Sequence, residues 1–434
     1  MKRTIKYMIQ IVIGTMLLML HLSCKETKKE KGMYQTPMEK EVTAKEILGN
    51  PNYLAISYGG YRQQSRDVQP TIEQLKEDMR ILSAMGIKLL RTYNVQLPQA
   101  PNILKAIRQL KEEDAGFEMY VMLGAWIDCK NAWTPLPPNH QEESPQNEEE
   151  IARAVALAKE YPDIVKILAV GNEAMVKWAA SYYVQPRVIL KWVNHLQDLK
   201  LKGELPKELW ITSSDNFASW GGGESTYHNK DLEELISAVD FVSLHTYPMH
   251  DTHYNPQFWG VLEEEEHLSY TEKIDKAMTR ARDYAISQYQ STVDYIESLG
   301  IDKPIHIGET GWASVSDEFY GPDGSKATDE YKQARYYKEM RDWTNASGIT
   351  CFYFEGFDEQ WKDSQNPEGS ENHFGLFTID GKAKYALWPL VDDGVFKGLK
   401  RDGNRIEKTY NGNKQLMMSQ VSLPPTKKIL VSTH

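Results

Sequence analysis

The chain has 434 residues, of which 41% are hydrophobic, and this content supports one large folded domain. Its net charge of −11 argues against nucleic acid or an anionic membrane surface as a binding partner. The 11 Trp and 24 Tyr supply aromatic faces that stack on neutral hydroxylated ligands such as sugars, although many such rings simply pack in cores.

The N-terminus has the pattern of an export signal. Three basic residues precede an apolar stretch from Met8 to Leu20, which is shorter than the roughly 20 residues that favour a spanning helix. Leu22-Ser23-Cys24 then resembles a bacterial lipobox, from which His21 departs because Leu is usual there. We expect a signal peptide at 1–23 and a lipid on Cys24, with ordinary secretion as the alternative.

Residues 24–45 are charged and lack apolar periodicity, so we expect a flexible tether. Together with the lipid, this tether predicts a protein anchored in a Gram-negative outer membrane, at the cell surface or on the periplasmic face. Cys129 and Cys351 are the only other cysteines. They are expected at opposite ends of the fold, so no disulfide is predicted.

From residue 46 onward, apolar strand patterns alternate with helical patterns. Eight strands are predicted: Tyr53–Gly59, Lys88–Asn94, Phe117–Ile127, Ile164–Glu173, Leu209–Asn216, Phe241–Pro248, Pro304–Ser314 and Ile349–Asp358. Thr71 and Gln74 predict a capping box at the start of the first helix between them. This alternation predicts an α/β fold, a (β/α)8 TIM barrel over residues 46–395, with a short C-terminal extension at 396–434.

An open doubly wound sheet is the alternative to a barrel. Such a sheet usually carries a glycine-rich phosphate loop after its first strand. The segment Tyr58-Gly59-Gly60-Tyr61-Arg62 has neither the required glycine spacing nor a helix directly after it.

Two glutamates, Glu173 and Glu309, end the fourth and seventh predicted strands. Catalytic groups of a barrel lie at the C-terminal ends of its strands. Two carboxylates presented there suit cleavage of a glycosidic bond, in which one group holds a proton while the other stays ionised. The competing interpretation is that each glutamate merely caps a strand on a solvated rim.

Several strand-end motifs resemble glycoside hydrolase family 17. They are Leu90-Arg-Thr-Tyr93, Val170-Gly-Asn-Glu173, Leu244-His-Thr-Tyr-Pro248, Gly308-Glu-Thr-Gly-Trp312, Phe352-Tyr-Phe-Glu-Gly-Phe-Asp-Glu359 with Trp361, and Asn372-His-Phe-Gly-Leu-Phe377. The resemblance runs from about Tyr53 to Phe377. It implies a retaining β-1,3-glucanase that cleaves laminarin-like β-glucan by double displacement, or a β-1,3-glucanosyltransferase on the same barrel.

The resemblance also assigns roles to individual residues. Glu173 matches the general acid/base, Glu309 the nucleophile and Asn172 the residue that binds the sugar 2-hydroxyl. Arg91 and Tyr247 match positions that hold the nucleophile ionised. The remaining candidates for substrate binding or support are Tyr58, Asp215, His245, Trp312, Glu355 and Trp361.

Other classes of function remain open. A zinc site is one interpretation of the side chains His245, His250, Asp251 and His253. Their spacing does not match a closed ligand set, so no metal and no cofactor is expected. A non-catalytic lipoprotein that captures glucan is disfavoured because degenerate binders usually lose at least one reacting glutamate. We expect a monomer, whereas endo or exo action is not decided by the sequence.

Overall fold

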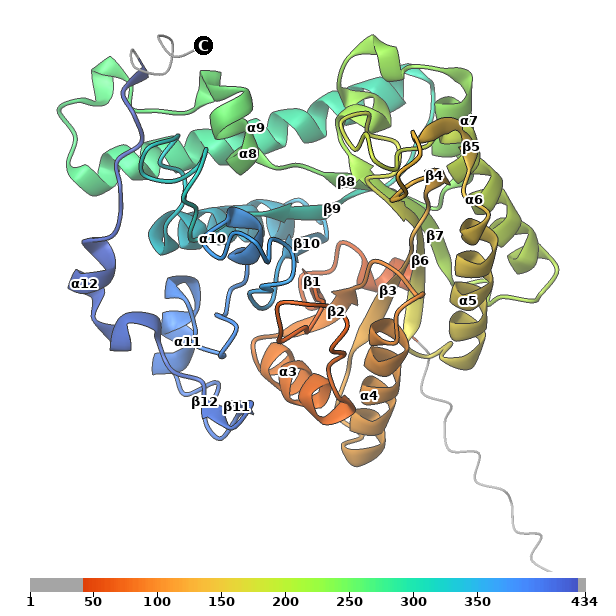
Figure 1. Cartoon of the computed structure of the whole chain (residues 1–434), viewed down its shortest axis with the longest axis horizontal. Coiled ribbons are helices and arrows are strands. Elements are labelled where there is room, and N and C mark those ends of the chain that lie inside the picture. The colour runs from red at the N-terminus through yellow and green to blue at the C-terminus, as the bar shows by residue number, and fades with distance from the viewer. Residues whose placement is uncertain (1–41, 428–434) are drawn as a thin grey trace, which may run out of the picture. The chain divides into compact units, whose positions relative to one another are not determined.

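The computed structural model describes residues 42–427. The expected signal peptide, Cys24 and most of the expected tether lie outside this range. Eight parallel strands close into a barrel in which each strand pairs with its neighbours (Figure 1). They are β1 (Leu54–Ser57), β2 (Ile87–Arg91), β3 (Tyr120–Ala125), β6 (Val165–Asn172), β7 (Trp210–Asn216), β8 (Val242–His245), β9 (Ile305–Gly311) and β10 (Cys351–Phe354). Each strand overlaps its predicted segment, and the predicted TIM barrel is confirmed.

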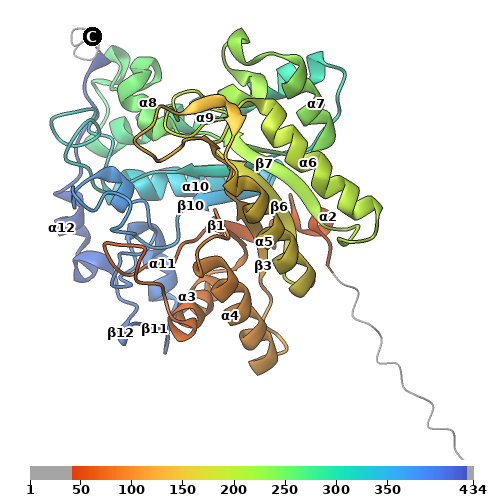
Figure 2. The ribbon, with the colours of Figure 1, turned by 45° about the vertical axis from the view of Figure 1, so that its right-hand side comes forward.

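Helices connect the strands and cover the outside of the barrel (Figure 2). The longer ones are α3 (Ile72–Ala84), α4 (Gln99–Glu113), α5 (Gln146–Glu160), α6 (Pro186–Leu201), α7 (Lys230–Ala238), α9 (Tyr270–Ser298) and α10 (Glu330–Ala346). The predicted capping box opens α3, where Thr71 accepts from the backbone of Gln74 and Gln74 reaches back. No helix between residues 42 and 427 is long and apolar enough to span a membrane.

The inside of the barrel is apolar at the N-terminal ends of the strands. Alternate residues of the strands face inward and form one cluster that includes Leu89, Met122, Ile167 and Phe352. The short helix α2 (Ala44–Ile47) adds Ala44 and Ile47 to this cluster. The folded part therefore includes α2, which begins within the span expected to be tether.

Two loops contain structure that the sequence patterns did not reveal. The long loop after β3 forms a hairpin of β4 (Cys129–Lys130) and β5 (Asn139–Glu143). The loop after β8 contains α8 (Pro248–Tyr254). Cys129 in β4 and Cys351 at the start of β10 are both buried free thiols.

The C-terminal extension packs against the barrel and its helices. It contains the hairpin of β11 (Lys400–Arg401) and β12 (Asn404–Arg405), and α12 (Lys414–Met418). Arg401 is fully buried, and its Nε lies 2.9 Å from Asp78 Oδ1 in α3. Asp78 also accepts from Arg62 at 2.9 Å and from the Tyr58 hydroxyl at 2.9 Å. This buried charge cluster joins residues more than 300 positions apart.

We predict that Arg401→Met lowers the free energy of unfolding by roughly 3 kcal/mol, the low end for a broken buried ion pair, because Arg62 still pairs with Asp78. Chemical denaturation measures this change. Arg405→Met in the same hairpin is the matched control, since Arg405 is exposed. Equal stability of the two variants would contradict a structural role for the extension.

Candidate active site

The local geometry of β9 aims Glu309 into the barrel. Ile307 pairs with Leu244 of β8. The next residue of β8, His245, pairs with Glu309 instead of Gly308, so β9 contains one extra residue. A bulge of this kind re-aims a side chain. Gly308 supplies the extra residue because a Cβ there would lie 2.0 Å from Ser243 Oγ. The bulge therefore turns the Glu309 carboxylate toward the centre of the C-terminal face.

Three donors from the ends of two strands, β2 and β8, surround the Glu309 carboxylate. Arg91 at the end of β2 forms an ion pair with Oε2, and the Tyr93 hydroxyl donates to the same oxygen at 2.7 Å. The Tyr247 hydroxyl donates to Oε1 at 2.6 Å. Burial alone would raise the pKa of Glu309, but the Arg91 charge and the hydrogen bonds from Tyr247 and Tyr93 outweigh burial and lower that pKa. Glu309 is thus an ionised carboxylate at neutral pH.

Arg91 connects Glu309 to the end of β6. Its Nη1 also donates to the Gly308 carbonyl at 3.0 Å, and its Nη2 donates to Asn172 Oδ1 at 2.5 Å. Asn172 therefore uses its oxygen inside the protein, which leaves the amide nitrogen as the donor available to a ligand. Arg91 is buried, so these contacts are shielded from solvent.

Glu173 follows β6 directly and has a left-handed backbone, with φ of 47°. Its N–H donates to the Ser214 carbonyl at 2.9 Å. The pairing of β6 with β7 also shifts between Ala169 and Asn172, so an irregularity precedes this glutamate too. Burial and then the negative charge of Glu309 raise the pKa of Glu173. Glu173 therefore holds a proton much more readily than Glu309.

His245 at the end of β8 touches Glu173. Its Nδ1 lies 3.2 Å from Glu173 Oε1, and its Nε2 lies 2.7 Å from the Ser214 hydroxyl. Burial lowers the pKa of His245 to about 4, so the ring is neutral at neutral pH. A neutral ring supplies a hydrogen bond to Glu173 without a positive charge that would lower the carboxyl pKa.

Asp215 supports the segment that follows Glu173. It is fully buried in β7 and accepts from the Met175 N–H at 2.7 Å and from the Ser219 hydroxyl at 2.6 Å. Burial raises its pKa to about 6 despite these hydrogen bonds. Both of its carboxyl oxygens accept hydrogen bonds from the protein, so Asp215 has the contacts of a supporting residue.

Two predicted site residues, Tyr58 and Trp312, are bound by other parts of the fold. The Tyr58 hydroxyl donates to buried Asp78, so this side chain belongs to the charge cluster that holds the C-terminal extension. Trp312 is fully buried, donates to the Ala327 carbonyl at 2.8 Å and packs on Trp259 and Tyr336. Both side chains are buried and hydrogen-bonded within the fold, so of the two expected roles, substrate binding or support, these contacts favour support.

Glu355 and Trp361 follow β10 and belong to one polar cluster. Lys362 Nζ lies 2.5 Å from Glu355 Oε1 and 3.9 Å from the centre of the Phe354 ring. The Trp361 indole donates to Glu359 at 2.9 Å. Phe354 packs edge-on against Tyr93 and Tyr247, which both bind Glu309. This cluster therefore adjoins the Glu309 side of the site.

The sequence alone predicted no role for Tyr93 or Lys362. Tyr93 lies two residues after Arg91, and residues two apart face the same way along a strand, so this spacing is the signal that identifies it. The described residues contain no group of three or more His, Cys, Asp or Glu placed to hold a metal ion. His250 instead stacks on Tyr247, and His253 stacks on Phe319.

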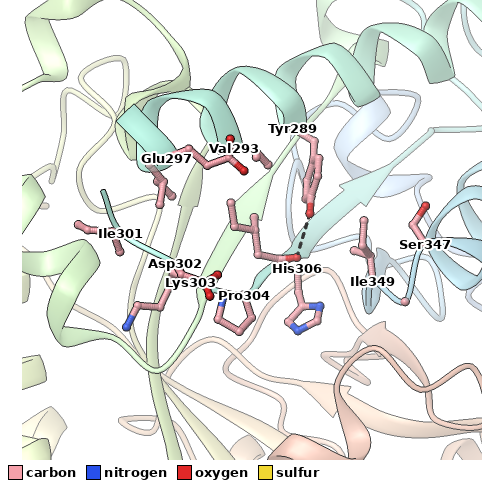
Figure 3. A pocket seen from close by; sticks show the side chains of 13 residues that line it. Tyr289, Val293, Glu297, Ile301, Asp302, Lys303, Pro304, His306, Ser347 and Ile349 are labelled. Carbon is pink, nitrogen blue, oxygen red and sulfur yellow. Dashed lines mark hydrogen bonds between the residues drawn. The ribbon is translucent and has the colours of Figure 1, made fainter. Parts of the chain in front are cut away.

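A cavity of about 270 Å³ lies at the other end of the barrel strands, between α9, the first residues of β9 and the segment that precedes β10. Figure 3 shows Tyr289 of α9 above His306, and Ile349 and Ser347 beside them. Burial lowers the pKa of His306 to about 4, so this side chain is neutral. The cavity is remote from the strand ends that present the two glutamates.

Residues 55–375 match the family model described as the BtgE/BtgC glycoside hydrolase domain. The crystal structure of an endo-laminarinase from Formosa Hel1_33_131 is 69% identical, with a TM-score of 0.89, and the match covers 91% of this chain and all of that chain. An active-site mutant of a Rhizomucor miehei β-1,3-glucanosyltransferase, bound to laminaritriose, shares the fold at 21% identity, with a TM-score of 0.53 over 77% of this chain and 96% of that chain.

A probable glucan endo-1,3-β-glucosidase, btgC, from Aspergillus terreus is 23% identical over 348 residues, which is 76% of this chain and 45% of that protein. This chain thus spans less than half the length of that Aspergillus relative. The family model nevertheless covers most of the chain, and the Formosa enzyme matches nearly all of it. The chain therefore belongs to the BtgE/BtgC glycoside hydrolase family, in agreement with the predicted resemblance to glycoside hydrolase family 17.

Proposed function

We propose that this protein is a retaining endo-β-1,3-glucanase that hydrolyses laminarin-like β-glucan as a monomer. The observation that carries the proposal is the different surroundings of two buried carboxyls. Arg91, Tyr93 and Tyr247 bind Glu309 and lower its pKa, whereas Glu173 contacts His245 and has a raised pKa. A pair of carboxyls tuned in this way supplies an ionised nucleophile and a protonated acid. The 69% identical endo-laminarinase supports β-1,3-glucan as the substrate and cleavage within the chain.

In the proposed mechanism Glu309 attacks the anomeric carbon while Glu173 protonates the departing oxygen. Glu173 then removes a proton from water, which displaces Glu309 from the glycosyl-enzyme intermediate. Asn172 donates its amide N–H to the sugar 2-hydroxyl. Arg91, Tyr93 and Tyr247 keep Glu309 charged, and His245 orients Glu173 without adding charge. Transfer to an acceptor sugar uses the same intermediate and differs only in what replaces water.

A non-catalytic capture protein is the competing function. Such a binder has no need for a carboxylate held charged by a buried arginine beside a second carboxyl held protonated. Both features cost stability when they are buried, and catalysis is the function that uses them.

We predict that linear β-1,3-gluco-oligosaccharides yield shorter products whose first-formed anomer is β. Retaining enzymes hold the two carboxyls about 5–5.5 Å apart, which leaves no room for water to attack directly. Proton NMR of the anomeric signals during the first turnovers measures the outcome. An initial α-anomer would mean inversion, longer products would mean transfer, and unchanged oligosaccharide would favour capture.

The two glutamates are expected to respond differently to replacement. Glu309→Ala should lose turnover and be partly rescued by azide as an α-glycosyl azide. Glu173→Ala should still release good leaving groups from aryl glycosides, which need no proton, and azide should give the β-product. Product anomers identified by NMR test the assignment, and the reverse pattern would exchange the two roles.

Arg91→Met should raise the acidic limb of the pH–rate profile. Glu309 acts when ionised, and Arg91 lowers its pKa, so loss of the charge moves the limb to higher pH by roughly one to two units. The basic limb reports loss of the Glu173 proton and should move less. Thermal unfolding controls for a fold defect, because Met retains much of the packing of the stem. An unmoved acidic limb at near-normal activity would assign Arg91 a purely structural role.

We also propose that Cys24 carries the lipid that anchors the protein in a Gram-negative outer membrane, on the cell surface or periplasmic face. This localisation is supported by the basic N-terminal residues, the apolar stretch that follows them and the segment Leu22-Ser23-Cys24. Cys24→Ala should move the protein from the membrane fraction to the soluble fraction with its activity retained. Fractionation and an activity assay test this, and unchanged membrane association would point to an uncleaved N-terminal anchor instead.

A further inference from the structure

The hairpin after β3 presents Trp133 to solvent. The residue is 64% exposed, although it is one of the largest apolar side chains of the protein. One face of its ring stacks on Tyr182, with ring centres 5.2 Å apart and planes 24° from parallel. The indole N–H lies 3.2 Å from Asp128 Oδ1, an oxygen that also accepts from Trp126. The stacked face and the polar edge thus have partners, and the ring still has a large area open to solvent.

The backbone around Trp133 is held in an uncommon conformation. Trp133 has φ of 59° and Asn131 has φ of 67°, in the left-handed region that bulky residues rarely occupy. The Asn131 side chain donates to the Pro137 carbonyl at 3.1 Å across the turn. Residues with such backbone strain persist where surrounding contacts enforce it, and they concentrate at binding sites.

The hairpin is joined to the segment that follows Glu173. The Cys129 N–H donates to the Tyr182 carbonyl at 3.0 Å. His140 stacks on Tyr183 with ring centres 3.7 Å apart, and its Nδ1 lies 2.8 Å from the Tyr183 carbonyl. The Val184 N–H, two residues after Tyr182, donates to the carbonyl of Ala174, the residue directly after Glu173, at 2.7 Å. The Trp133 ring is therefore fixed relative to Glu173.

We propose that Trp133, backed by Tyr182, binds a glucosyl unit of β-1,3-glucan on the leaving-group side of the scissile bond. The inference rests on the proposed function and specifies where the substrate chain lies. Glu173 protonates the departing oxygen, so the departing part of the chain passes the segment that carries Glu173 and Tyr182. The Glu309 partners Arg91, Tyr93 and Tyr247 lie at or just beyond the ends of β2 and β8. In the proposed binding mode the remainder of the glucan lies on this Glu309 side of the site.

A flat apolar face suits this ligand. A glucosyl ring has an apolar face of C–H groups, which stacks on indole, while its hydroxyls remain free for water or for nearby acceptors. The Trp133 ring on the leaving-group side and the Glu355–Lys362 cluster on the other side bind the glucan on both sides of the cleavage point. Binding on both sides favours cleavage within a long glucan over removal of terminal units.

The test compares laminarihexaose, in which the leaving group is sugar, with 4-nitrophenyl β-laminaribioside, in which the leaving group is 4-nitrophenol. The aryl group has no sugar beyond the cleavage point, so loss of the platform should not affect it. Trp133→Ala should lower kcat/KM for laminarihexaose roughly 5- to 10-fold, the size of one lost aromatic contact. It should leave kcat/KM for the aryl substrate within about 2-fold of wild type, which is below the range of such a contact.

Two further variants separate the ring from the hairpin. Trp133→Phe keeps an aromatic face and should restore most of the laminarihexaose activity. Leu136→Ala removes another exposed apolar side chain of the same hairpin, 60% exposed, and should leave both activities unchanged. Equal losses on both substrates for Trp133→Ala, or no loss on either, would overturn the inference alone. A wild-type protein that cleaves neither substrate would overturn the proposed function and the inference with it.

Discussion

The buried pair of Arg91 and Glu309 is the interaction on which the site depends. Moving a carboxylate and a guanidinium out of water is costly unless both find close partners. Here Arg91 also bonds the Gly308 carbonyl and Asn172, while Glu309 accepts from Tyr93 and Tyr247. These partners lie on β2, β6 and β9 or just beyond β2 and β8, so only the closed barrel brings them together. The C-terminal face holds this polar network above an apolar interior that includes Leu89, Met122 and Ile167.

The same network explains how two identical residue types acquire different chemistry. Glu309 contacts the permanent positive charge of Arg91 and the hydroxyl groups of Tyr93 and Tyr247. Glu173 is also largely buried, but it contacts a histidine that burial keeps neutral, and the largest charge effect on its pKa comes from the negative Glu309. Glu309 therefore loses its proton easily and Glu173 retains one. The ionised state of one carboxyl stabilises the protonated state of the other, which is the arrangement that double displacement requires.

Two irregular strand ends place these side chains. In β9 the Ile307 side chain faces outward, and strict alternation would make the side chain two residues later, Glu309, face outward too. The extra residue Gly308 reverses the direction of Glu309. At the end of β6, Gly171 has φ of 81° and Glu173 has φ of 47°, so the chain leaves the strand in a conformation that aims the second carboxyl. A side chain at Gly308 would collide with Ser243 and Ser214. The glycines next to the glutamates are therefore part of the positioning of the site.

The sequence alone determined the number and order of the barrel strands, the capping box at Thr71, and the presence of two glutamates at strand ends. Each of these follows from local periodicity or from neighbouring residues, which a single chain displays directly. Tertiary structure decided the inward aim of Glu309, the hydroxyl that Tyr93 adds, the burial of Trp312, and the use of Tyr58 and Arg401 in a structural charge cluster. It also decided that the loop after β3 is a hairpin that exposes Trp133. These features depend on partners tens to hundreds of residues away, because strand register and side-chain burial arise only when the barrel closes.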